Sequence, residues 1–315
     1  MQEYADWLDA KDLLWPAAPK VEPVKATAYT KPLDGVRGVA WSLYGTLLFI
    51  ADGKLVLMHN QQLRMQIALE KTIQEFNMWN SMSRKPGAPW EYMLSQYTRL
   101  VEDKELGAGP RPGEKPEVNA ADIWSKLIDR LGRKEYSYDE EFYGDIDELA
   151  EKVAYFFHSC LQGVGASPNA LAGLNAVAEA GFTQGIVGDG QVFSLVQLLR
   201  CLRKQGPTPA VAHFFSPSCI ALSYEVGAKH PSPSLMHTCV QQFAAQGIKP
   251  REIVCISSRL RDELALAKKA GMRTALFAGD KNSLQATPSD IKDSDLRPDR
   301  ILTDAGQVRQ ILGLE

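Results

Sequence analysis

The stretch Gly38-Val39-Ala40-Trp41-Ser42-Leu43-Tyr44-Gly45-Thr46 carries the clearest structural signal in the chain. A short apolar run that ends at Tyr-Gly-Thr is typical of a buried strand running into a turn, and it predicts the first strand of a sheet. Leu47–Ile50 and Lys54–Leu57 follow on either side of Ala51-Asp52-Gly53. Because Asp-Gly between apolar runs is a hairpin signal, we expect a small β-hairpin flap after the strand.

The chain after Gly163 alternates between helix and strand patterns. Pro168 stands in the first turn of a predicted helix that stops at Gly181. Repeated strand-then-helix units predict a parallel sheet with helices on both faces, which is an α/β architecture. Strands are expected at Thr183–Val187, near Phe214, at Ile253–Ile256, at Arg273–Phe277 and from Arg300, with helices around Val192–Leu202, from Ser232, at Asp262–Ala270 and after the last strand.

Two further segments flank or interrupt this α/β pattern. Residues 1–37 contain Pro16, Pro19, Pro23 and Pro32, which favours an extended chain lying on the surface of a domain. Residues 58–160 are predicted to form an all-helical insert in a core made of residues 38–57 and 161–315. The insert has apolar residues at helical spacing in three stretches: Met65, Leu69, Ile73 and Phe76; Ile123, Leu127 and Leu131; Ile146, Leu149, Val153 and Phe156.

Composition excludes several classes of function. The 315 residues include 45% hydrophobic and 23% charged residues, as expected of a globular protein. The net charge of -3 offers no basic surface for a nucleic acid. We expect no signal peptide and no membrane span, hence a cytoplasmic protein without nucleic-acid or membrane partners. The five cysteines include no CxxC pair, so reduced, buried thiols are expected.

In a parallel sheet the ligand lies at the carboxyl ends of the strands, so the loops after the strands are the candidate site. Read in order, these loops resemble the four signatures of the haloacid dehalogenase-like (HAD) hydrolase superfamily. The resemblance covers residues 38–315 and is strongest at Trp41–Leu48, Tyr224–Pro233 and Ala267–Met272. It implies a HAD-like Rossmannoid three-layer core, with residues 58–160 as the family's type-one helical cap.

The first signature of the family is D-x-D-G-T, in which the first Asp attacks the substrate and the second is the general acid and base. Ser42 and Tyr44 occupy these positions, followed by Thr46. The dehalogenase branch has D-x-Y-G-T, so Tyr44 matches that branch, but the attacking carboxylate is missing. A serine needs a base to become a nucleophile, and the Tyr44 phenol has a reference pKa near 10.

The second and third signatures are altered as well. The second normally ends in Ser or Thr, where this chain has Gly188 followed by Asp189 and Gly190, which also fits a simple turn. The third has Lys directly before Pro, where this chain has His230, with Lys229 one residue earlier. An imidazole is a weaker substitute for an ammonium group, since it is only partly charged near neutral pH.

The fourth signature supplies carboxylates to magnesium. Its G-D pair aligns with Ser257 and Ser258, and its later acid with Glu263, beside Asp262. Magnesium prefers hard oxygens with one or two carboxylates, so Asp262 and Glu263 are weak metal candidates, and helix capping explains them equally well. We therefore expect no metal cofactor, except Mg²⁺ if the chain is an active hydrolase.

Every signature is thus changed at its chemically active position. The sequence predicts a HAD-like pseudo-hydrolase, catalytically impaired, that binds a small anionic molecule or a protein partner. The alternative is an active hydrolase of phosphatase or dehalogenase type, with a rearranged set of residues such as Ser42, His230, Lys229, Asp189 and Glu263. The candidate catalytic residues at the motif positions are Ser42, Tyr44, His230 and Lys229. The candidate ligand-binding residues are Thr46, Gly188, Asp189, Gly190, Ser257 and Ser258.

Overall fold

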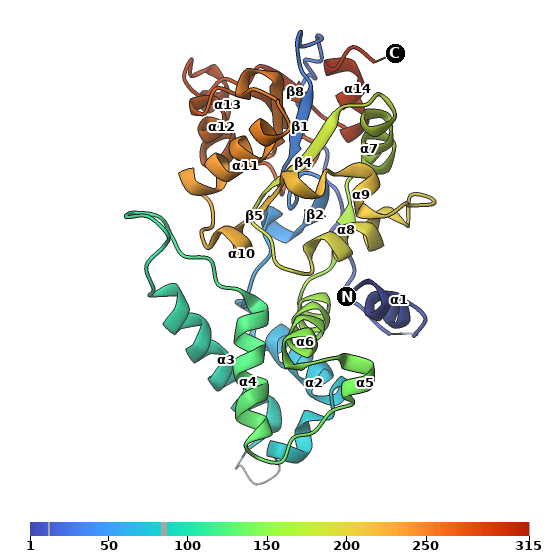
Figure 1. Cartoon of the computed structure of the whole chain (residues 1–315), viewed down its shortest axis with the longest axis vertical. Helices are drawn as coiled ribbons and strands as arrows, with labels where there is room; N and C mark the ends of the chain where they lie inside the picture. The colour runs from blue at the N-terminus through green and yellow to red at the C-terminus, as the bar shows by residue number, and fades with distance from the viewer. Residues whose placement is uncertain (12, 83–86, 315) are drawn as a thin grey trace.

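The structure is a computed structural model that describes residues 1–11, 13–82 and 87–314. Its centre is a six-stranded, all-parallel sheet with the strand order β5-β4-β1-β6-β7-β8 (Figure 1). This arrangement confirms the predicted α/β class. The strands are β1 (Gly38–Trp41), β4 (Thr183–Gly188), β5 (Ile220–Leu222), β6 (Ile253–Ser257), β7 (Arg273–Phe277) and β8 (Arg300–Leu302).

Alternation of side chains along the strands builds a hydrophobic layer on each face of the sheet. Val39 and Trp41 of β1 pack on one side, and Ala40 packs on the other. Both faces of the central strands are buried, as expected of a parallel sheet covered on both sides. One face is covered by α7 (Ala170–Glu179), α8 (Ser194–Leu202) and α14 (Val308–Ile311), and the other by α11 (Pro233–Ala245) and α12 (Ala265–Lys269).

Two local predictions are wrong. Leu48–Ile50 forms strand β2, but β2 pairs antiparallel with β3 (Val164–Ala166) and not with the residues after Gly53. A 3₁₀ turn at Ala51–Gly53 takes the chain away from the expected hairpin. The segment near Phe214 is a short helix, α9 (Val211–Phe214), and the strand comes later as β5.

Helices fill the insert between β2 and β3. Their apolar sides meet in one cluster that includes Leu69, Trp124 and Phe157. Met65, Leu69 and Ile73 on α2 and Ile123, Leu127 and Leu131 on α4 are buried, as their spacing predicts. The helices are α2 (Gln62–Glu75), α3 (Pro89–Glu105), α4 (Ala120–Gly132), α5 (Glu140–Tyr143) and α6 (Ile146–Leu161), with a 3₁₀ segment at Met78–Met82.

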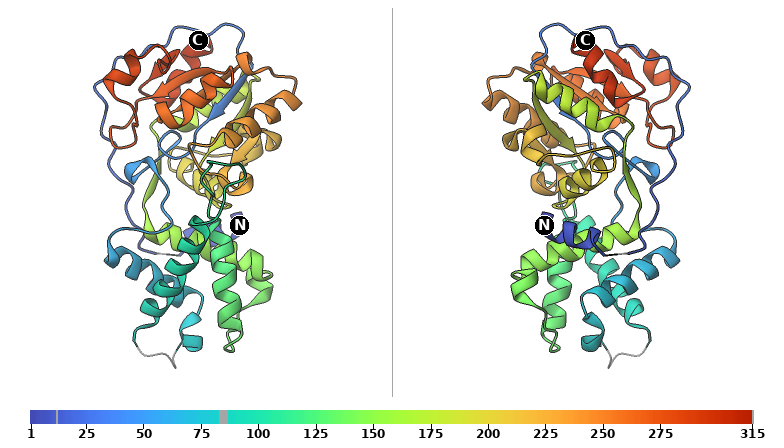
Figure 2. Two further views of the ribbon diagram at one scale, coloured as in Figure 1. Left: turned by 90° about the vertical axis from the view of Figure 1, so that its left-hand side faces the viewer. Right: turned by 90° about the vertical axis from the view of Figure 1, so that its right-hand side faces the viewer.

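The N-terminal extension touches both the insert and the core. Helix α1 (Gln2–Asp9) buries Tyr4 in the aromatic cluster of the insert, beside Phe76 and Tyr155, and lies at the junction of the two parts in Figure 1. The chain then runs to the far end of the core (Figure 2), where Tyr29 forms an antiparallel β-bridge with Ile301 of β8. Residues 13–37 therefore form an arm along the surface.

All five cysteines are buried and free of disulfide bonds, as predicted. Among the described residues, no helix is both long enough and apolar enough to span a membrane. The remaining short helices are α10 (Ser223–Val226) and α13 (Pro288–Lys292).

Candidate functional site

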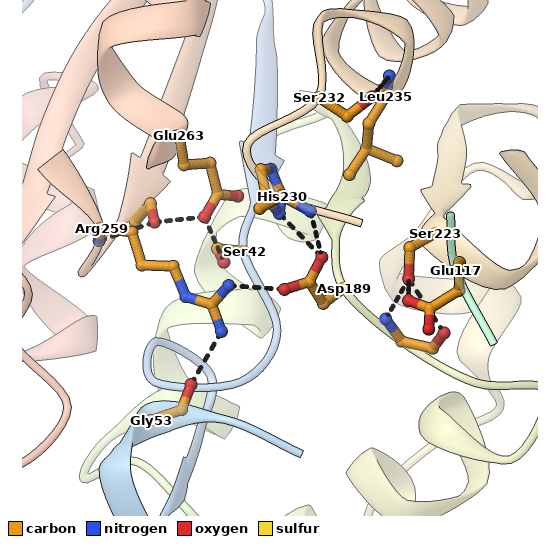
Figure 3. Close-up of polar contacts among 12 residues, drawn as sticks. Ser42, Gly53, Glu117, Asp189, Ser223, His230, Ser232, Leu235, Arg259 and Glu263 are labelled. Atoms are coloured by element: carbon orange, nitrogen blue, oxygen red, sulfur yellow. Dashed lines mark hydrogen bonds and ion pairs between the residues drawn. The ribbon is translucent and has the colours of Figure 1, made fainter. Parts of the chain in front are cut away.

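The loops after β1 and β6 meet around one buried carboxylate. Glu263 Oε2 accepts hydrogen bonds from Ser42 Oγ at 3.0 Å and from Ser257 Oγ at 2.6 Å. Glu263 has no solvent exposure, and Ser42 is 3% exposed. The residue at the nucleophile position therefore donates its hydroxyl proton to a neighbouring carboxylate inside the protein (Figure 3).

Glu263 reaches this position because the helix after β6 begins with a π-helical turn, Leu260–Leu264. The N–H of Leu264 donates to the carbonyl of Arg259, five residues earlier. A wider turn of this kind shifts the side chains relative to a regular helix, and it is common at functional sites. The sequence places Glu263 after the strand, but this turn aims its carboxylate at Ser42.

A second buried cluster joins Asp189, His230 and Arg259. Asp189 Oδ1 accepts the backbone N–H of His230 at 2.8 Å and lies 3.1 Å from its Nδ1. Asp189 Oδ2 lies 2.6 Å from Arg259 Nη1, and Arg259 Nη2 donates to the carbonyl of Gly53 at 3.0 Å. Arg259 thus reaches across from the β6 loop to the loops after β2 and β4 (Figure 3).

These contacts set the charges of the cluster. Burial alone would raise the pKa of Asp189, but His230 and Arg259 outweigh it and hold that pKa well below its usual range. Burial lowers the pKa of His230, but Glu263 and Asp189 reverse the effect and leave it above the usual value. Since an ionised carboxylate only accepts hydrogen bonds, the Nδ1 of His230 carries a proton.

Gly188 leaves a small open position between the two clusters. A Cβ on Gly188 would lie 3.5 Å from Ser42 Oγ, 3.6 Å from Glu263 Oε1 and 3.8 Å from His230 Cε1. Its φ of +146° also favours glycine. Glu263 Oε1 and His230 Nε2 have no hydrogen-bond partner among the described residues, so a water molecule or a small polar group fits this position.

Two of the four candidate catalytic residues lie outside these clusters. The Tyr44 hydroxyl donates to Gln197 Oε1 of α8 at 2.7 Å, and burial raises its pKa well above the usual value. Lys229 Nζ lies 3.2 Å from Glu105 of the insert, in a partly exposed ion pair. The structure therefore brings together Ser42 and His230, but neither Tyr44 nor Lys229.

The remaining candidates have structural partners. The hydroxyl of Thr46 accepts the backbone N–H of Ser258 at 3.1 Å, which ties the β1 loop to the β6 loop. The Ser258 hydroxyl is buried and has no partner among the described residues. The N–H of Gly190 donates to Ser223 Oγ at 2.9 Å. Asp262 is half-buried, beside Glu263 but outside its hydrogen bonds.

Comparisons with known proteins bear on the fold. No protein-family model matches the chain, and no curated protein sequence matches it. Among solved structures, the 2-haloacid dehalogenase of Pseudomonas syringae pv. Tomato DC3000 aligns at 17% identity with a TM-score of 0.50, over 88% of this chain and 98% of that one. The chain has the HAD-like hydrolase fold.

Other structures of the same superfamily align over similar lengths. The putative HAD-hydrolase YfnB of Bacillus subtilis aligns at 15% identity, over 89% of this chain and 99% of that one, with a TM-score of 0.44. A HAD phosphatase of Thermococcus onnurineus aligns at 14% identity over 89% and 99%, with a TM-score of 0.46.

The side chains at the HAD magnesium position do not fit a magnesium ion. Ser42 and Ser258 carry no charge, and Asp189 is paired with Arg259 and His230. Among the described residues, Glu263 is the carboxylate that contacts Ser42. The guanidinium of Arg259 also repels a divalent cation. Among the described residues, no group of three or more His, Cys, Asp or Glu side chains is arranged to hold a metal.

The insert meets the HAD-like core through residues 114–119, which we call the crossing segment. Pro116 pairs with Ala228 in a β-bridge, and the N–H of Glu117 donates to Gly227. Glu117 Oε2 accepts a hydrogen bond from Ser223 Oγ at 2.5 Å. The insert is therefore held against the loops that follow β4 and β5.

A cavity of about 270 Å³ lies between the insert and the core. Asp189 lines it on the core side, whereas Ser42 and Glu263 do not line it and are buried. Its apolar wall is formed by Leu55–Met58 and Val101, and its polar end by Glu105, Glu117, Asp189 and Lys229.

Sequence reasoning missed two functional residues. Arg259 directly follows the Ser257-Ser258 pair, so its place after β6 was a usable signal. Glu117 follows a loop rich in Gly and Pro within the insert, and no pattern in the sequence connects it to Ser223. Both residues place an ionisable side chain at the junction between the loops.

Proposed function

We propose that this HAD-fold protein does not hydrolyse a substrate at the inherited site and acts instead by binding, with its helical insert as a cap over the cavity. One observation carries this proposal: Ser42, at the nucleophile position, is buried and hydrogen-bonded to the fully buried Glu263. An attacking group must reach the substrate. Here Asp189 lines the cavity, but neither Ser42 nor Glu263 does.

The test is a hydrolysis panel on the full-length protein. Phosphate monoesters and 2-haloacids are assayed with and without 5 mM magnesium, using the parent, Ser42→Asp and, as a matched control, Ser42→Ala. We expect no turnover above the blank by either the parent or Ser42→Ala. Turnover by the parent near the usual enzyme range of about 1–10³ s⁻¹, lost in Ser42→Ala, would overturn the proposal.

The Ser42–Glu263 hydrogen bond favours a second candidate function, hydrolysis with a serine nucleophile. A carboxylate 3.0 Å from a serine hydroxyl can act as its general base. This route excludes Lys229 and Tyr44, whose polar atoms face other elements. It requires Ser42 to become accessible to a substrate. Glu263→Gln would then abolish turnover, because it removes the general base.

The ligand expected from the sequence is a small anion or a protein partner. Loss of the carboxylates at positions 42 and 258 supports an anion, since both are now neutral serines. However, three acidic side chains line the cavity together with the cation Lys229, and they are Glu105, Glu117 and Asp189. The charges around the cavity therefore support a cationic ligand.

A further inference from the structure

The cavity between insert and core combines an apolar wall with a charged end. Leu55–Met58 and the buried Val101 form the wall. The cavity has a volume of about 270 Å³. It therefore suits a small molecule with a hydrocarbon part and one polar end.

The ion pairs at the polar end leave one carboxylate without an ion-pair partner among the described residues. Glu105 pairs with Lys229 at 3.2 Å, and Asp189 pairs with Arg259 at 2.6 Å. Glu117 is held by neutral donors, namely the Ser223 hydroxyl, the N–H of Val118 at 2.8 Å and the Gln191 amide at 3.5 Å. Among the described residues, no Lys, Arg or His nitrogen lies within 4 Å of its carboxylate.

The charged groups that act on Glu117 are Asp189 and Lys229 of the core, with Glu105 at the same end of the cavity. Burial raises the pKa of Glu117 to about 7, and the charge of Asp189 adds to this shift. The Ser223 hydrogen bond and the charge of Lys229 oppose it. A cation in the cavity would favour the ionised form of Glu117, whereas an anion would meet one more negative charge.

We propose that the cavity binds a small amphipathic cation, whose ammonium group pairs with Glu117 and whose hydrocarbon part lies on Leu55–Met58 and Val101. This inference rests on the proposed function, in which the protein acts by binding. A cationic ligand replaces the anionic ligand expected from the signatures, because the crossing segment brings to the cavity a carboxylate without an ion-pair partner among the described residues.

The test compares four probes on the full-length protein by NMR titration: n-butylammonium, methylammonium, 1-butanol and butyrate. We expect butylammonium to bind tightest, at least tenfold tighter than butyrate. Each buried methylene adds up to about fourfold, so methylammonium should bind more weakly than butylammonium. Because Glu117 must be ionised, affinity for butylammonium should rise about tenfold from pH 6 to pH 8.

Matched variants locate the site. Glu117→Gln should weaken butylammonium binding at least tenfold at pH 8, whereas Glu102→Gln, an exposed acid on the same insert, should leave it within about twofold. Butyrate binding as tightly as butylammonium, an unchanged affinity in Glu117→Gln, or no binding of any probe at 50 mM would each overturn the proposal. Turnover in the hydrolysis panel would contradict the proposed function and would leave this result unaffected.

Discussion

Replacing Asp189 with Asn tests whether the Asp189–Arg259–His230 cluster is a buried electrostatic contact. The substitution leaves two cationic side chains, 5% and 1% exposed, without their carboxylate. Removing one partner of a buried ion pair costs about 3–5 kcal/mol. Since 27% of the Asp189 side chain is exposed, we expect the lower end, a loss of about 3 kcal/mol in the free energy of unfolding.

Urea unfolding followed by tryptophan fluorescence measures this loss, because Trp41 is buried in β1 beside the cluster's loops. Glu105→Gln is the matched control: its ion pair with Lys229 is partly exposed, and such pairs contribute less than about 1 kcal/mol. The double variant Asp189→Asn with Arg259→Met should lose less than the sum of the single variants, since the two residues interact directly.

The pH dependence adds a second check. The lowered pKa of Asp189 gives stability that is present above about pH 4 and is lost as the pH falls through the folded value. The raised pKa of His230 gives stability that is present below about pH 6.5 and is lost as the pH rises through the folded value. The difference in free energy of unfolding between the parent and Asp189→Asn should therefore be largest between about pH 4 and pH 6.5. A loss under about 1 kcal/mol, or a gap that widens above pH 8, would refute the reasoning.

Three further predictions concern the arm and the insert. Gly163→Ala places a Cβ 2.0 Å from the carbonyl oxygen of Ala17, so it should push the arm away and cost about 1–3 kcal/mol. Gly132→Ala, with nothing within 4 Å of its Cβ, should be neutral or stabilising; equal urea midpoints for the two variants would contradict the close contact. Tyr4→Ala should cost about 3–5 kcal/mol, while Tyr4→Phe, which removes a buried hydroxyl without a partner among the described residues, should cost nothing. If α1 were not packed against the insert, neither Tyr4→Ala nor Tyr4→Phe would change the free energy of unfolding. Glu117→Gln should make the free energy of unfolding less dependent on pH between about pH 4.5 and 7. The raised pKa of Glu117 stabilises the fold at low pH, and this stabilisation is lost as the pH rises through that range. Thermal melts in which parent and variant have parallel pH dependences would exclude this contribution of Glu117.

The strands of the core were predictable because their signals are local. Short apolar runs bounded by Gly or Pro placed β1, β4, β6, β7 and β8 within a residue or two. The changes at the four signatures can also be read directly, since a missing carboxylate is a property of the residue itself. The predicted hairpin failed because β2 has three residues and its partner, β3, lies beyond the whole insert. Strand pairing across that separation leaves no local pattern.

The chemistry of the candidate site was decided by tertiary structure. The sequence placed Ser42 and Glu263 after their strands, but a π-helical turn determines that their side chains meet. Packing against α8 turns the Tyr44 hydroxyl away from Ser42. The crossing segment brings Glu117 beside Ser223, more than a hundred residues away in the chain. Side-chain direction and the sign of the local charge depend on which loops fold against one another, and residue spacing along the sequence does not contain that information.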